Sequence, residues 1–158
     1  MKKIVCNILF TLMIVLFSSC LTSGLEELDV YDGADITSVS SVRYRYITAD
    51  KNPASGENEV KEVELIFTSN IDTEAEVVSI SIKKPENFPP EELDNLSTSN
   101  LLVVVGVSTA ARVFPQDGAP KLGTPGDWSK PNKFVVEAAD GTKKTWTIEV
   151  VQLEKIIR

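Results

Sequence analysis

Phe134-Val-Val-Glu-Ala-Ala-Asp-Gly-Thr-Lys-Lys-Thr-Trp-Thr-Ile-Glu-Val150 is the stretch of sequence that decides the fold. Apolar and polar residues alternate on both sides of its Asp-Gly pair, which predicts two antiparallel strands joined by a turn. Phe134 and Trp146 can face the same core only if the residue numbers of two residues that lie opposite each other in the hairpin add to an even number. A three-residue loop ending at Gly141 meets that condition, whereas a two-residue loop does not. We therefore expect Phe134 opposite Trp146 and a left-handed backbone at Gly141.

The same alternation marks further strands earlier in the chain. Their apolar residues are Val42, Tyr44 and Tyr46, then Val63, Leu65 and Phe67, then Val78, Ile80 and Ile82. Residues 101–107 are apolar at nearly every position, which predicts a central strand buried on both faces, and a further strand is expected near residues 110–114. Residues 89–93 begin with two prolines followed by acids, which favours one short helix. Short strands separated by turns indicate an all-β antiparallel sandwich or barrel.

A longer pattern covers the C-terminal part of the chain. It runs Ala111-x-Val113-x-Pro115-x-x-Gly118, then Gly126-Asp127-Trp128-Ser129-x-Pro131, and continues through the hairpin from Phe134 to Val150. This pattern resembles the second half of an immunoglobulin-like module common in Bacteroidetes envelope lipoproteins. The resemblance implies an immunoglobulin-like antiparallel β-sandwich over residues 36–158. Many relatives join the module to a carbohydrate-binding or carbohydrate-metabolism domain, so the resemblance also implies a role near glycans at the cell envelope.

The first 20 residues are typical of a bacterial lipoprotein signal. Two lysines precede an apolar run, and Ser18 and Ser19 stand directly before Cys20. Leu16-Phe17-Ser18-Ser19-Cys20 resembles the lipobox of such signals. The run over residues 4–17 has 14 residues, fewer than the roughly 20 of a transmembrane helix; an ordinary cleaved signal and a retained helix are the alternatives. We expect residues 1–19 to be removed and Cys20 to carry lipid, anchoring the protein to the outer membrane on its periplasmic or its surface side.

Residues 20–35 are predicted to form a lipidated acidic tether. Its acids are Glu26, Glu27, Asp29, Asp32 and Asp35. Because like charges repel and glycines add freedom, the tether should be extended. It should hold the domain of residues 36–158 clear of the lipid headgroups.

The composition excludes several functions. The sequence contains no histidine, and its two cysteines are Cys20 and Cys6, which lies in the signal. A Ser-His-Asp triad and histidine or cysteine metal sites are therefore excluded, and we expect neither an enzyme nor a cofactor. The formal net charge of −7 disfavours nucleic acid as a partner, because no basic stripe is present.

Two acidic segments could serve catalysis or metal binding, but each also has a purely structural interpretation. Glu62 and Glu64 share one face of a strand, at a spacing that suits two glycosidase carboxylates, but a solvated polar surface is the expectation. The oxygen-rich loop of residues 50–59 offers calcium ligands without EF-hand spacing, and its alternative is a polar hairpin loop.

Aromatic residues are the candidates for sugar binding, because a ring face contacts a pyranose while nearby polar groups bond its hydroxyls. Trp128 lies in a glycine- and proline-rich loop with Asp127 and Asn132 close by, whereas Tyr44 and Tyr46 share one strand face. Each has a structural alternative. For Trp128, the family resemblance implies that the ring closes the end of the sandwich. For the two tyrosines, the structural alternative is packing in the core.

Two functions from different classes follow. The first is a non-catalytic lipoprotein that binds glycans or serves adhesion as an accessory module, which requires an exposed aromatic ring beside polar groups. The alternative is a structural spacer or assembly subunit, which requires an exposed apolar patch or an unpaired sheet edge. The expected partners are the membrane, through the lipid on Cys20, and a polysaccharide or another envelope protein.

Overall fold

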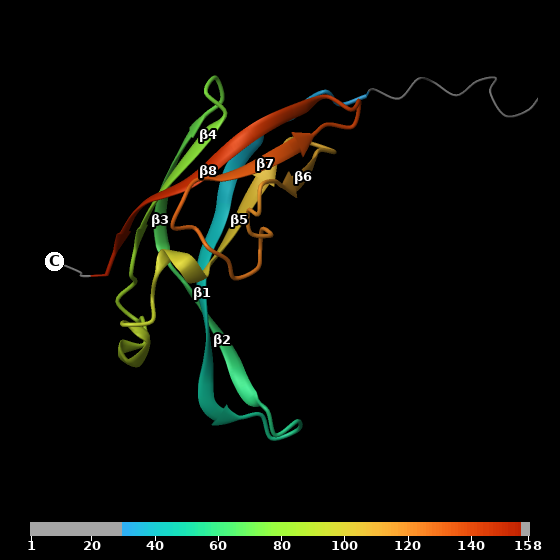
Figure 1. Cartoon of the computed structure of the whole chain (residues 1–158). Coiled ribbons are helices and arrows are strands. Elements are labelled where there is room, and N and C mark those ends of the chain that lie inside the picture. Colours follow the sequence, from blue (N-terminus) through green and yellow to red (C-terminus); the bar gives the residue numbers. More distant parts are fainter. Residues whose placement is uncertain (1–29, 156–158) are drawn as a thin grey trace, which may run out of the picture.

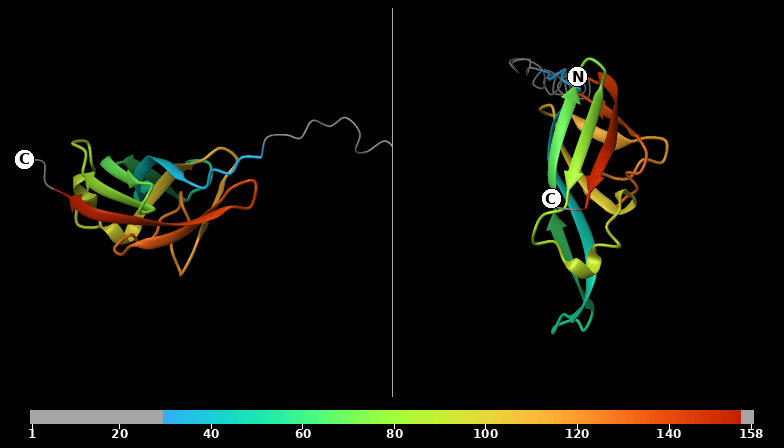
Figure 2. Two further views of the ribbon diagram at one scale, coloured as in Figure 1. Left: turned by 90° about the horizontal axis from the view of Figure 1, so that it is seen from above. Right: turned by 90° about the vertical axis from the view of Figure 1, so that its left-hand side faces the viewer.

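The computed structural model describes residues 30–155, which form a sandwich of two β-sheets (Figures 1 and 2). The strands are β1 (Ile36–Lys51), β2 (Asn58–Glu64), β3 (Ile66–Asp72), β4 (Val77–Lys83), β5 (Leu101–Val107), β6 (Arg112–Pro115), β7 (Asn132–Glu137) and β8 (Lys143–Glu154). One sheet has the order β2-β1-β5 and the other the order β3-β4-β8-β7-β6. The predicted all-β sandwich is confirmed. In place of the short helix, the described residues contain two single 3₁₀ turns, η1 (Pro90–Glu92) and η2 (Thr98–Asn100).

The hairpin of β7 and β8 has the predicted register. Phe134 lies opposite Trp146, and the Ala138 N–H donates to the Thr142 carbonyl at 2.8 Å across the three-residue loop. Gly141 has φ +91°. Both aromatic side chains are fully buried in the core, which is shared by both sheets. The lipid attachment site and the signal lie outside the described residues.

One strand pair departs from the expected antiparallel arrangement. β4 and β8 run parallel, with Val78 opposite Ile148 and Ile80 opposite Val150. A parallel pair needs a long crossover, and the chain between β4 and β8 supplies it by way of β5, β6 and β7. The inward residues of β4 are fully buried, as the alternation of residues 78–82 predicts.

The segment predicted as one strand around Val63, Leu65 and Phe67 is divided between the two sheets. β2 pairs with β1, and β3 pairs with β4 after the chain crosses at Leu65. Leu65 is buried there, and its N–H donates to the Val42 carbonyl at 2.8 Å. All three side chains still pack into the core, because a crossing at an inward residue preserves the alternation.

The prediction that residues 101–107 form a central strand is wrong. β5 is the edge strand of its sheet, and a loop rather than a strand covers its outer edge. Gly126 exchanges two backbone hydrogen bonds with Leu101, and the Gly123 N–H donates to the Val103 carbonyl at 2.8 Å. The loop therefore satisfies backbone groups that a neighbouring strand would otherwise bond.

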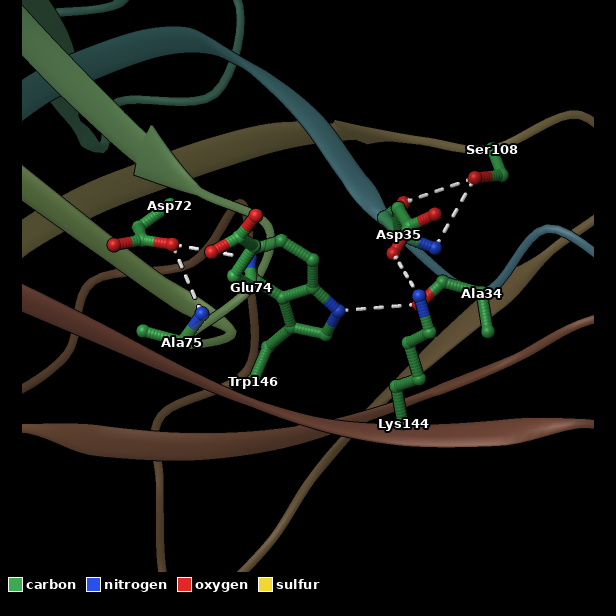
Figure 3. Close-up of polar contacts among 8 residues, drawn as sticks. All are labelled: Ala34, Asp35, Asp72, Glu74, Ala75, Ser108, Lys144 and Trp146. Carbon is green, nitrogen blue, oxygen red and sulfur yellow. Dashed lines mark hydrogen bonds and ion pairs between the residues drawn. The ribbon is translucent and has the colours of Figure 1, made fainter.

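Residues 34 and 35, the last two of the predicted tether, are bonded to the domain. Ala34 is fully buried, and its carbonyl accepts a hydrogen bond from the Trp146 indole at 3.1 Å (Figure 3). The Asp35 carboxylate accepts a hydrogen bond from the Lys144 ammonium at 2.6 Å, and the Asp35 backbone is hydrogen-bonded to Ser108. Charge attraction and the small alanine side chain thus draw the end of the acidic segment into the domain. We call these contacts of residues 34–35 the N-terminal clamp.

β1 extends well beyond the sandwich. Its pairing with β5 stops at Tyr44, and the remainder pairs only with β2. We call this two-stranded projection, residues 45–62, the arm. A strand of 16 residues spans about 50 Å at ~3.3 Å per residue. The tip of the arm and the N-terminal clamp consequently lie at opposite ends of the molecule (Figure 1).

Replacing Gly141 by valine tests the hairpin loop. At φ +91° a β-branched side chain is strained, and nothing lies within 4 Å of a Cβ at this site, so the cost comes from the backbone alone. We expect Gly141→Val to lower the free energy of unfolding by about 1 kcal/mol or more, measured by urea denaturation. Ala139→Val, at an exposed position of the same loop, is the control. Equal midpoints for the two variants would contradict the loop assignment.

Candidate functional site

A line of aromatic rings leads from the core to the base of the arm. Tyr44 is buried; its ring lies 5.6 Å from that of Phe88 and stacks on Tyr46 at 6.1 Å, with 10° between the two ring planes. Tyr46, the next residue on the same face of β1, is only half-buried. The alternation of the strand puts both rings on one face, and because the pairing of β1 with β5 stops at Tyr44, the second ring lies nearer the surface.

Beside Tyr46 lies a groove of about 320 Å³ between the arm and η1, which we call the arm groove. Its lining residues are Tyr46, Ile47, Thr48, Ala49, Asp50, Lys61, Glu91 and Glu92. Strand β1 supplies the aromatic and small residues, β2 supplies the lysine, and η1 supplies two carboxylates. The hairpin of β1 and β2 thus meets η1, which is distant from it in sequence, at one hollow.

The lysine of the arm groove is held in place by acids. Lys61 is opposite Tyr46 in the strand register and forms ion pairs with Asp50 at 3.1 Å and Glu59 at 3.7 Å. The hydrogen bond that the Lys61 ammonium donates to the Asp50 carboxylate raises the pKa of Lys61 above its usual value. Because this ammonium already has two carboxylate partners, the acids of η1 leave the arm groove with an excess of negative charge.

Glu92 joins the arm groove to the core. Its Oε2 accepts hydrogen bonds from the Tyr44 hydroxyl at 2.8 Å and from the Asn95 amide at 3.1 Å. Burial, followed by the hydrogen bond to Glu92, raises the pKa of Tyr44 to about 12. The carboxylate is thereby fixed in orientation, while Glu91 next to it is exposed.

The arm also carries a cluster of charges around Glu62 and two exposed apolar side chains. Glu62 pairs with Arg45 at 2.6 Å and with Arg43 at 3.2 Å, and these hydrogen bonds lower its pKa. A carboxylate held in this way is a poor proton donor. Ile47 and Val60 lie opposite each other beyond the two arginines and are 65% and 58% exposed.

Trp128 lies in the core rather than at the surface. It is fully buried, its ring stacks on Phe134 at 5.9 Å, and its indole N–H donates to the Leu101 carbonyl at 3.0 Å. These contacts match the structural alternative, in which the ring closes the end of the sandwich. No ring face is free for a sugar there. Tyr44 is likewise a core residue.

Asp127 and Asn132 hold the loop beside Trp128. Asp127 accepts a hydrogen bond from the Ser129 N–H at 2.9 Å, and its hydrogen bonds to that serine lower its pKa. Asn132 is buried, and its amide donates to the carbonyls of Asp127 and Lys130 at 3.0 Å. Among the five candidate residues, only Tyr46 lines the arm groove, and Tyr44 lies beneath it in the core.

The loop at the tip of the arm is an ordinary hairpin loop. Asn52 accepts hydrogen bonds from the N–H groups of Ala54 and Ser55, and Gly56 takes the left-handed position at φ +73°. Asp50 and Glu59 face Lys61. Within residues 30–155 no group of three or more acidic or cysteine side chains is arranged to hold a metal ion. The same residues contain no helix long and apolar enough to cross a membrane.

Two features escaped sequence analysis. Glu91 and Glu92 belong to the segment predicted as a short helix. No local sequence pattern shows that this segment, η1, lies beside the arm. Phe114 is 41% exposed, lies under the Arg112 guanidinium at 5.6 Å, and lines an apolar hollow of about 370 Å³ with Lys121 and Leu122. Its place on the last, four-residue strand of the sheet leaves it without cover.

Comparison with known proteins supplies the family. Residues 36–149 match the model of the family described as DUF5018-related. The chain belongs to this family. It is also similar to a Bacteroides fragilis protein of known crystal structure, described as a "putative secreted protein", with 46% sequence identity and a TM-score of 0.69. The alignment covers 80% of this chain and 99% of that one. Among curated proteins no match was found.

Alkaline pH tests the buried contact between Tyr44 and Glu92. The folded pKa of Tyr44, about 12, exceeds the value of about 10 in an unfolded chain. The stability from this group is complete below about pH 10 and is lost as pH rises toward 12. We expect the urea midpoint of the wild type to fall over this range more steeply than that of Tyr44→Phe. Tyr31→Phe, at an exposed tyrosine, should follow the wild type. Parallel curves for wild type and Tyr44→Phe would contradict the assignment.

Proposed function

We propose that this protein is a non-catalytic lipoprotein of the cell envelope that binds neutral glycans in the arm groove. The observation that carries the proposal is the half-buried Tyr46 ring, set beside one ammonium and several carboxylates. The accessible part of this ring, beside polar groups, supports the first of the two candidate functions. The likeness to a secreted Bacteroides protein supports export, and the resemblance to modules found beside carbohydrate-binding domains supports the ligand class.

The chemistry of the arm groove suits a sugar. An aromatic face provides apolar contact with the C–H groups of a pyranose, and carboxylates accept hydrogen bonds from its hydroxyls. The fixed Glu92 and the exposed Glu91 line the arm groove as acceptors, and the Lys61 ammonium can donate. A polyanionic glycan would meet the excess of carboxylates, so charge favours a neutral one.

The shape of the molecule suits capture at a distance from a membrane. Lipid on Cys20 would place the N-terminal clamp at the membrane-proximal end. Tyr46 lies ten residues along β1 from Ile36, or about 33 Å at ~3.3 Å per residue. The arm would therefore present the groove away from the anchored end.

A non-catalytic role agrees with the state of the acids. Glu62 is held by two arginines, and Glu92 is engaged by Tyr44 and Asn95. Hydrolysis of a glycoside requires one carboxyl group that can donate a proton. Glu92 engaged in this way is better suited to holding a ligand than to that step, and Glu62 does not line the arm groove.

A glycan array with residues 21–158 tests the proposal. This fragment contains every described residue, and the related crystal structure consists of the same domain over 99% of its length. We expect saturable binding to neutral glycans, weakened about tenfold in Tyr46→Ala, because an aromatic contact is worth about 0.5–1.5 kcal/mol beyond its area. Tyr46→Phe should retain most of the binding, since the ring remains.

Phe114→Ala is the matched control, because it removes an exposed ring far from the arm groove in sequence and on the other sheet. It should bind as the wild type does. Binding that is lost in Phe114→Ala and kept in Tyr46→Ala would place the ligand elsewhere. No binding to any glycan would remove the proposed function.

A further inference from the structure

β3 is the last strand of the five-stranded sheet, and its outer edge has no partner among the described residues. It pairs with β4 on one side over all seven residues, without a register shift. Figure 2 (right) shows β3 at the border of the sheet, next to β4. Thr68, Ser69 and Asn70 are exposed at its centre, and Ile66 is 55% exposed at its start.

Within residues 30–155 the other three sheet edges are protected and that of β3 is not. Proteins block free edges with prolines, charged side chains, short strands or covering loops. β6 has four residues and ends in Pro115, β2 carries charged side chains at most positions, and the loop with Gly123 and Gly126 covers β5. β3 has no proline, lysine or arginine, and its one acid, Asp72, stands at its end.

The residue pattern of β3 suits pairing with itself. Phe67, Ser69 and Ile71 lie on the face toward the core, opposite Ile82, Ile80 and Val78 of β4. Two antiparallel copies that continue one sheet must place inward residues opposite inward residues. A pairing centred on Ser69 does so over the whole strand. It sets Phe67, which is half-buried, opposite the half-buried Ile71 of a second copy.

The charges at the two ends of β3 also suit this arrangement. Asp72, Glu74 and Glu76 lie at the turn into β4, and the last two form no ion pair within the described residues. Asp72 accepts hydrogen bonds from the Glu74 and Ala75 N–H groups, which fixes the turn (Figure 3). Lys84 lies at the other end with Lys83, which pairs with Glu154 of its own chain at 3.3 Å and is 64% exposed. An antiparallel pairing brings the acidic end of one copy beside the basic end of the other.

We propose that β3 pairs antiparallel with β3 of a second copy of this chain, about a two-fold axis at Ser69. The two five-stranded sheets become one continuous sheet across the dimer. Asp72 of one copy then lies opposite Ile66 of the other, on the same face as Lys83 and about 10 Å from it along the sheet. The pairing does not depend on a ligand in the arm groove.

Disulfide trapping tests both the contact and its register. The fragment of residues 21–158 contains no cysteine, so each variant carries one thiol. In Ser69→Cys the two thiols are directly opposite, about 4.5–5.5 Å between Cα atoms, which a disulfide can span. In Thr68→Cys and Asn70→Cys the equivalent atoms are diagonal, about 7–8 Å apart, beyond that range.

Mild oxidation should give at least about tenfold more covalent dimer for Ser69→Cys than for the two neighbouring variants, given this difference in reach. Equal yields from all three would indicate random collision and overturn the proposal. More dimer from either neighbour than from Ser69→Cys would overturn the register.

Light scattering on the unmodified fragment tests the pairing without cross-links. The dimer fraction should rise with concentration, and Ser69→Lys should be monomeric, because two ammonium groups would meet at the axis. Gln116→Lys, exposed just after β6, should dimerise as the wild type does. An unfolding midpoint for each variant confirms that it is folded. A wild type that is monomeric at all concentrations, or a Ser69→Lys variant that dimerises equally well, would overturn the proposal.

Discussion

The hydrogen bond from the Trp146 indole to the Ala34 carbonyl fixes where β1 begins, and β1 carries both the core and the arm. The register of β7 and β8 brings the indole inward, opposite Phe134. Because β1 is one strand, the residues that follow the clamp lead first into the core and then into the arm. Two register shifts, between Ile36 and Ser38 and between Val39 and Ser41, precede the regular pairing that begins at Ser41. The position of Tyr46 is therefore set by packing far from it.

Contacts with the core also hold the base of the arm, and with it the arm groove. An isolated two-stranded ribbon is only marginally stable in water. Here the base of the arm is supported by Phe88 and Glu92 against Tyr44, and its strands are joined by the ion pairs of Glu62 and Lys61. A groove held in this way loses little conformational freedom when a ligand binds. In a dimer formed through β3, two such grooves could engage one polymer, which increases avidity.

Much of the fold was predictable because alternation is a local property. The β7–β8 loop follows from the parity of Phe134 and Trp146, and the buried face of β4 follows from its branched residues. The site was less predictable because burial depends on partners that are distant in sequence. Trp128 has the loop setting of a ligand contact, yet Leu101 and Phe134 enclose it. Tyr44 and Tyr46 are alike in sequence, and only the end of β5 makes one of them a core residue. Nothing local indicates that η1 packs against the arm.

The most direct test of the account is a two-dimensional NMR titration of residues 21–158 with a neutral oligosaccharide that binds on the array. The account predicts that shift changes concentrate at Tyr46, Lys61, Glu91 and Glu92, and that contacts between sugar protons and the Tyr46 ring are detected. Changes confined to the sandwich around Phe114, with the arm resonances unmoved in the presence of demonstrated binding, would contradict it.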